Sequence, residues 1–181
     1  MGELSSNIAV LDYDAKNGQL SLRNILSTIP DDWTEHNGAA AVRQSSDGKF
    51  VYVSNRGNNT IAVFSSDEKG DLKLIQRIST EGDFPRDFNL SDDESFVICL
   101  NQNSDNATLY ARDAESGKLT MLQKDFAVPE GVSVLRKKSE RSKAVRNWNL
   151  SRLNQKFLGL EFVVEVLKWK FLLYAAVLRK E

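Results

Sequence analysis

The sequence is poor in the residues that carry covalent and metal chemistry. Its 181 residues include one cysteine, one histidine, two methionines and three prolines. The single cysteine, Cys99, excludes an internal disulfide and suits a reducing compartment. The sequence also lacks a Cys/His spacing typical of a metal site, a phosphate-cradling glycine loop and a nucleophile-elbow motif. We therefore expect no metal site.

The near-neutral net charge of −1 hides an asymmetry along the chain. Residues 136–181 contain 12 of the 24 Lys and Arg residues but only 4 of the 25 Asp and Glu residues. Proline is absent after Pro129. This swing of charge indicates two segments with a boundary near Leu135. Because no charged stretch followed by an apolar run opens the chain, we predict no secretory signal and a cytoplasmic protein.

Residues 7–135 contain an internal repeat. Phe50 aligns with Phe96 at an offset of 46 residues, and the same offset aligns Asn55 with Asn101. Each unit holds four short stretches rich in β-branched and aromatic residues, separated by Gly and Asn turns, as in a β-propeller blade. The sequence predicts an all-β fold, a partial β-propeller of about two and a half four-stranded blades over residues 1–135. The predicted strands are 8–14 and 20–27, then 40–45, 50–55, 60–66 and 72–79, then 86–90, 96–101, 107–112 and 118–124, and a last inner strand at 128–135.

The basic segment has a different pattern. Residues 136–152 are predicted to be a linker, and residues 153–181 an amphipathic α-helix, because apolar residues recur at spacings of four and three from Leu153 to Leu178. Charged residues interrupt the stretch, so we expect no transmembrane segment. One reading is that the helix covers an exposed face of the propeller or pairs with a partner. The other is that this segment is out-of-family sequence from a shifted or joined reading frame. Nucleic-acid binding is not expected, because aromatic residues are not interleaved in a defined groove.

Four phrases in the repeat resemble the lactonase family. They lie at residues 47–57, 60–64, 82–88 and 101–106, and the third looks like the family's Gly-x-x-Pro-Arg-x-Phe element. The family includes 6-phosphogluconolactonases and fungal carboxymuconate-lactonising enzymes, which are seven-bladed and need no cofactor or metal. The resemblance covers residues 7–136, which implies the C-terminal part of such a ring. It implies hydrolysis of a sugar lactone, such as 6-phosphogluconolactone to 6-phosphogluconate in the pentose phosphate pathway.

Hydrolysis of a lactone needs an activated water, a group that stabilises the oxyanion, and cations for an anionic substrate. Arg86 precedes an inner strand, and we expect it to face the central channel. His36 is the sole histidine, the residue type that most often serves as a general base near neutral pH. The candidate catalytic residues are therefore Arg86 and His36, and the candidate substrate-binding residues are Arg43, Asn55, Arg56 and Asn101.

Structural roles remain open for several of these residues. Arg86 could form a salt bridge with Asp83 or Asp87, and His36 could simply be solvated in its loop. Arg43, which stands where many relatives carry a histidine, could also form a structural salt bridge. The chain as a whole could be a non-enzymatic propeller fragment, serving as a binding module or left by a broken gene. Exposed blade faces, or the C-terminal helix, could support self-association.

Overall fold

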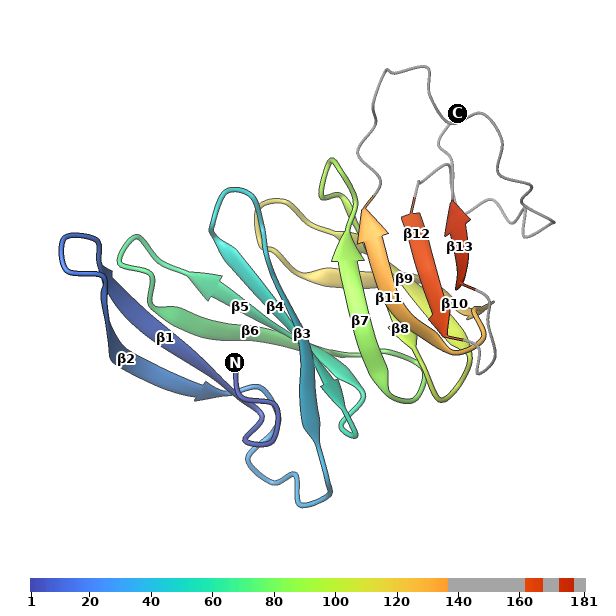
Figure 1. Ribbon diagram of the computed structural model, residues 1–181, viewed down its shortest axis with the longest axis horizontal. Helices are drawn as coiled ribbons and strands as arrows, with labels where there is room; N and C mark the ends of the chain where they lie inside the picture. Colours follow the sequence, from blue (N-terminus) through green and yellow to red (C-terminus); the bar gives the residue numbers. More distant parts are fainter. Residues whose placement is uncertain (137–161, 168–172, 178–181) are drawn as a thin grey trace.

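The computed structural model describes residues 1–136, 162–167 and 173–177. Two four-stranded antiparallel sheets form its centre, in the strand orders β3-β4-β5-β6 and β7-β8-β9-β10. The two-stranded sheet β1-β2 precedes them and the three-stranded sheet β11-β12-β13 follows them (Figure 1). The strands are β1 Asn7–Asp14, β2 Gln19–Ser27, β3 Gly38–Gln44, β4 Phe50–Arg56, β5 Thr60–Ser66, β6 Leu72–Ser79, β7 Pro85–Leu90, β8 Phe96–Asn101, β9 Asn106–Arg112, β10 Leu119–Ala127, β11 Gly131–Arg136, β12 Phe162–Leu167 and β13 Leu173–Val177.

A serine and an aspartate close the same tight turn in both full sheets. The Ser45 hydroxyl donates to the Asp47 carboxylate at 2.6 Å, and its oxygen accepts the Phe50 amide N–H at 3.0 Å. In the next sheet, Ser91 makes the same contacts with Asp93 at 2.7 Å and with the Phe96 amide at 3.0 Å. Side chains that bond to nearby amides in this way favour a turn over continued strand. The repeat in sequence is therefore a repeat in structure.

The sheets stack face to face and bury apolar side chains between them. Between β3–β6 and β7–β10 the core includes Tyr52, Ile61, Phe88 and Tyr110. A second cluster fills the space between β1-β2 and β3–β6, and a third lies between β7–β10 and β11. The innermost strands β3, β7 and β11 lie side by side near the centre of the molecule (Figure 1). Stacked blades around inner strands define the propeller architecture.

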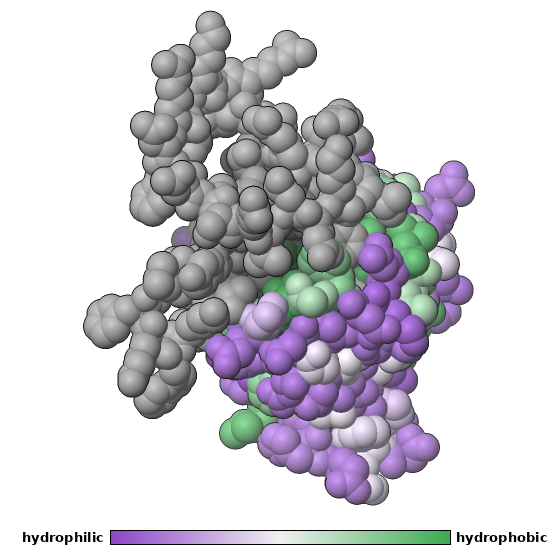
Figure 2. Space-filling view, turned by 90° about the vertical axis from the view of Figure 1, so that its right-hand side faces the viewer, coloured by the Kyte–Doolittle hydropathy of each residue, from purple (hydrophilic) through white to green (hydrophobic). Residues whose placement is uncertain are grey.

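The all-β partial propeller predicted from the sequence is confirmed. Ten of the predicted strands agree with β1 to β10 within three residues at each end, and the last predicted strand, 128–135, overlaps β11. The reason is that the turn chemistry recurs with the repeat, so strand ends are fixed locally. Seen from the β10 and β13 side, the described residues present a largely hydrophilic surface, with hydrophobic residues gathered beside the grey atoms (Figure 2).

The predicted C-terminal helix is wrong for the described parts of its range. Within residues 153–181, the described segments 162–167 and 173–177 are strands β12 and β13, and β12 pairs antiparallel with β11. An inner strand such as β11 offers unpaired backbone groups along its edge, and pairing them outweighs a helical spacing of apolar residues. The predicted linker at 136–152 lies outside the described residues beyond Arg136. No helix in the described part of the chain is long and apolar enough to cross a membrane.

Candidate functional site

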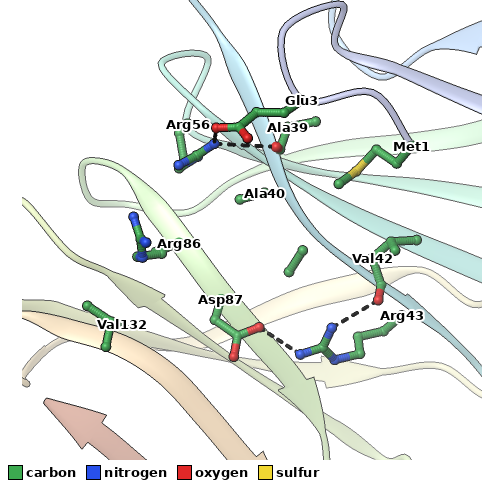
Figure 3. Close-up of a pocket in the computed structure, with 11 residues that line it drawn as sticks. Met1, Glu3, Ala39, Ala40, Val42, Arg43, Arg56, Arg86, Asp87 and Val132 are labelled. Atoms are coloured by element: carbon green, nitrogen blue, oxygen red, sulfur yellow. Dashed lines mark hydrogen bonds and ion pairs between the residues drawn. The ribbon is translucent and has the colours of Figure 1, made fainter.

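A cavity of about 580 Å³ lies against the inner strands. Strand β3 contributes the small side chains of residues 39–41, which leave room for a ligand, and β11 contributes Val132. The N-terminal residues Met1 and Glu3 line the same cavity. Its charged lining consists of Glu3, Arg43, Arg56, Arg86 and Asp87 (Figure 3). Three arginines and two carboxylates therefore converge from four segments of the chain.

Arg43 on β3 is paired with Asp87 on β7. Arg43 Nη2 lies 2.7 Å from Asp87 Oδ1, and the two side chains are 34% and 12% exposed. The other carboxylate oxygen of Asp87 accepts the Val134 amide N–H at 2.9 Å and the Ser133 hydroxyl at 3.3 Å. Asp87 thus links all three inner strands, β3, β7 and β11. The structural salt bridge left open for Arg43 is observed, and Arg43 lines the cavity as well.

Arg56, at the end of β4, is held on three sides. Its guanidinium donates to the Gly38 carbonyl at 3.2 Å and forms an ion pair with Glu3. The guanidinium carbon also lies 4.9 Å from the centre of the Phe84 ring, a cation–π distance. The Arg56 side chain is 12% exposed and that of Glu3 is 61% exposed. Arg56 is therefore fixed in place, whereas the Glu3 side chain, which also lines the cavity, is mostly exposed.

Arg86 differs from the other two arginines because no carboxylate in the described part of the chain pairs with it. The salt bridges considered for it do not form, since Asp87 binds Arg43 and Asp83 accepts hydrogen bonds from Asn59 and Asn103. Among the described residues no ion pair or hydrogen bond involves the Arg86 side chain, and no dashed line reaches it in Figure 3. An exposed guanidinium in a cavity, with all of its donors free, is a ready partner for an anion.

Asn55 and Asn101 occupy equivalent, fully buried positions outside the cavity lining. The Asn55 amide donates to the Thr28 carbonyl at 3.1 Å and its oxygen accepts from the Thr28 hydroxyl at 2.7 Å. The Asn101 amide donates to the Thr80 carbonyl at 2.9 Å, while its side-chain oxygen has no hydrogen-bond partner among the described residues. Both side chains tie one sheet to the strand end of the sheet before it. Their predicted substrate contact stays a prediction.

His36 lies in the loop before β3, where it is exposed. It does not line the cavity that holds the three arginines. Its carbonyl crowds Gly57, whose φ of 113° is a conformation that favours glycine. The structure thus brings together Arg43, Arg56 and Arg86 but not His36, whose catalytic role stays a prediction.

Glu3 is the cavity residue that the sequence analysis missed. Gly2 forms a β-bridge with Asn7, and Asn55 pairs in the same way with Thr60. Glu3 follows Gly2 as Arg56 follows Asn55. Glu3 therefore occupies the position that Arg56 has in the next sheet. The equivalence is visible in the strand pairing, which relates β1 to β5 and extends back to residue 3. In the described part of the chain, no group of three or more His, Cys, Asp and Glu side chains is placed to hold a metal ion.

The fold and the site define a β-propeller protein with a cationic cavity at its inner strands. A sequence model described as "Lactonase, 7-bladed beta-propeller" matches residues 1–136, so the chain belongs to the lactonase family. It is 40% identical over 135 residues to the 6-phosphogluconolactonase of Bacillus subtilis, which covers 74% of this chain and 39% of that protein. It is 46% identical over 136 residues to an uncharacterized protein of Lactococcus lactis, which covers 75% of this chain and 40% of that protein.

Two solved structures show the same likeness. A protein from Lactobacillus plantarum is 64% identical with a TM-score of 0.71, over 72% of this chain and 38% of that one. The periplasmic gluconolactonase of Pseudomonas aeruginosa is 35% identical with a TM-score of 0.66, over 71% of this chain and 36% of that one. The chain therefore spans about 40% of the length of the curated relatives it matches.

Proposed function

We propose that this chain carries the anion-binding part of a sugar-lactone hydrolase site and acts on 6-phosphogluconolactone, giving 6-phosphogluconate. The observation that carries the proposal is the free guanidinium of Arg86 in the cavity beside two arginines that are already fixed. Family membership and the named lactonases among the relatives support the substrate class. The predicted absence of a cofactor is part of the proposal.

Arg86 has the chemistry to stabilise the oxyanion. When water attacks the lactone carbonyl, negative charge develops on the carbonyl oxygen, and a cationic donor stabilises that charge more than it stabilises the neutral ester. Arg43 and Arg56 have carboxylate partners that hold their guanidinium groups in the cavity wall. Such preorganised cations suit the phosphate of the substrate.

Glu3 is the best candidate for the general base. Of the two carboxylates in the described lining, Asp87 is buried and accepts three hydrogen bonds, whereas Glu3 is mostly exposed and meets Arg56 alone. Glu3 would take a proton from the attacking water as the carbon–oxygen bond forms. It would then return the proton to the ring oxygen as the ester bond breaks. The catalytic role predicted for His36 remains a second possibility, tested by His36→Gln.

A cytoplasmic location belongs to the same proposal. The sugar phosphates of the pentose phosphate pathway suit it, and the one cysteine is buried and free, as expected in a reducing compartment. The related gluconolactonase of Pseudomonas aeruginosa is described as periplasmic, so family membership by itself does not assign the compartment.

A lactonase assay on the 181-residue chain tests the proposal. We expect 6-phosphogluconolactone to disappear faster than it hydrolyses spontaneously, and Arg86→Ala to lower the catalysed rate by about 100-fold or more. Arg23→Ala is the matched control, because Arg23 lies on β2 in ion pairs with Asp12 and Asp71, outside the cavity lining, and should retain full activity. A folded chain with a β-rich far-ultraviolet spectrum and no turnover would instead favour the non-enzymatic binding module.

A further inference from the structure

Phe84 stands in the turn before β7 with a left-handed backbone. Its φ of 64° is unfavourable for a bulky side chain, and the following Pro85 favours an extended backbone instead. Two hydrogen bonds hold this conformation. The Phe84 amide donates to Asn59 Oδ1 at 3.0 Å, and the Phe84 carbonyl accepts the Gln102 amide N–H at 3.0 Å. Residues held in such a conformation by their surroundings cluster at functional sites.

The turn itself does not need an aromatic side chain. It recurs one repeat later, where Glu130 has a φ of 51° and its amide donates to Asp105 Oδ1 at 2.7 Å. Phe84 is partly buried and belongs to none of the three apolar clusters of the described residues. The backbone of Phe84 is therefore part of the repeated scaffold, whereas its ring serves neither the turn nor these clusters.

The ring contacts Arg56, and both residues depart from the repeat. The offset of 46 residues aligns Phe84 with Gly38, and it aligns Arg56 with Gln102. The guanidinium carbon of Arg56 lies 4.9 Å from the centre of the Phe84 ring. Two departures from the repeat thus meet between neighbouring sheets. Where a pattern is otherwise kept, such departures are expected at functional sites.

The ring restrains Arg56 without using any of its hydrogen-bond donors. Arg56 Nε donates to the Gly38 carbonyl, and Nη2 contacts Glu3 and, at 3.5 Å, the Ala39 carbonyl. Nη1 makes no hydrogen bond to any residue that the structure describes. A cation–π contact engages the face of the guanidinium and leaves its N–H groups free. An arginine that is ordered in advance loses less side-chain entropy when it binds an anion.

We propose that Phe84 is a positioning residue, which holds the Arg56 guanidinium so that Nη1 is presented to a phosphate group in the cavity. Arg56 lines the cavity and Phe84 does not, so Phe84 acts through Arg56. That this phosphate belongs to 6-phosphogluconolactone rests on the proposed function. The ordering of Arg56 and its contact with a phosphate do not.

Nitrogen-15 NMR of the Arg56 side chain tests the proposal without requiring turnover. The Arg56 Nε–H signal is assigned by its loss in Arg56→Lys. We expect this hydrogen to exchange slowly with solvent, and its signal to shift saturably as inorganic phosphate is added. Phe84→Leu, which keeps an apolar side chain in the same backbone conformation, should speed the exchange and weaken phosphate binding by about fivefold. Phe84→Tyr keeps the ring face and should restore both properties.

Phe96→Leu is the matched control, because Phe96 is also partly buried but packs in the cluster between β7–β10 and β11, outside the cavity lining. It should leave the exchange rate and phosphate binding unchanged. An Arg56 signal that Phe84→Leu does not alter would overturn the proposal, as would phosphate binding of undiminished affinity in that variant. Equal effects of Phe84→Leu and Phe96→Leu would overturn it too, because they would report only a general loosening of the fold.

The lactonase assay separates this positioning role from the chemical step. The phosphate is bound equally well in the ground state and in the transition state. Phe84→Leu should therefore raise the KM for 6-phosphogluconolactone by about fivefold and change kcat by less than about twofold, and with gluconolactone, which lacks the phosphate, neither constant should change. A fall in kcat at constant KM would overturn the positioning role. No turnover by the unaltered chain, together with the expected phosphate titration, would overturn the proposed function alone.

Discussion

Replacing Asp87 by alanine and by asparagine separates the two tasks of its carboxylate. One oxygen holds Arg43 at 2.7 Å, and the other accepts the Val134 amide at 2.9 Å. Alanine leaves the Val134 amide, which is fully buried, without this acceptor, at a cost of about 1–3 kcal/mol. The ion pair with Arg43, which is 34% exposed, adds about 1 kcal/mol. We expect Asp87→Ala to lower the free energy of unfolding by about 3 kcal/mol.

Asparagine keeps an oxygen for the Val134 amide and removes only the charge. Asp87→Asn and Arg43→Gln should therefore each cost about 1 kcal/mol, and the double variant should cost less than their sum. Urea unfolding followed by tryptophan fluorescence measures all four free energies. If Asp87→Asn lowers the free energy of unfolding as much as Asp87→Ala, the hydrogen bond from the Val134 amide to Asp87 does not account for the destabilisation. An alanine variant that loses less than about 1 kcal/mol would refute the link between the three inner strands.

Three further predictions concern buried or hydrogen-bonded groups. Asn55→Ala should cost about 2 kcal/mol in urea unfolding and Asn101→Ala about 1 kcal/mol, because the Asn101 oxygen has no partner to lose. Burial raises the pKa of the Cys99 thiol, so a thiol reagent should leave Cys99 unmodified near pH 8 until denaturant unfolds the chain. The hydrogen bond from the Ser45 hydroxyl lowers the pKa of the Asp47 carboxyl, and the hydrogen bond from the Lys49 backbone amide lowers it further. The ionised Asp47 carboxylate therefore stabilises the fold at pH values above its unfolded-state pKa, and this stabilisation is lost as the pH falls through its lower native-state pKa. In Asp47→Asn, the free energy of unfolding should fall less steeply with decreasing pH below about pH 5.

Strand positions could be predicted from the sequence because their ends depend on local chemistry. The turn made by Ser45 and Asp47 returns as Ser91 and Asp93, and each bonds to amides within five residues. Such turns form in much the same way wherever the pattern occurs. One offset of 46 residues between the two copies of the repeat therefore predicts the strand positions in both four-stranded sheets.

The C-terminal segment shows the limit of a spacing argument. Apolar residues at intervals of four and three predict a helix, yet the described parts of this segment are strands paired to β11. Residues 162–167 include three valines, and β-branched residues favour strands. The decisive contribution, an open edge on β11, is a tertiary feature that spacing along the chain does not report.

The site was predicted in part. Arg43 and Arg86, predicted on or beside inner strands, do line one cavity together with Arg56, predicted at the end of a second strand. The partner of Arg43 could not be assigned, because Asp87 is 44 residues away along the chain and meets it only when the sheets stack. Asn55 was chosen from a phrase shared with the family, and the structure shows a buried amide with backbone partners. Sequence alone does not separate a polar residue that joins blades from one that faces a ligand.

Binding of 6-phosphogluconate, the stable product, to the 181-residue chain tests the central claim that Arg86 is the free cation of an anion site. Isothermal titration calorimetry measures it without requiring turnover. The cavity geometry predicts saturable binding that weakens at least tenfold in Arg86→Ala and is unchanged in Arg23→Ala. Equal affinity in Arg86→Ala and the unaltered chain would contradict the claim, as would the absence of binding to a chain shown to be folded.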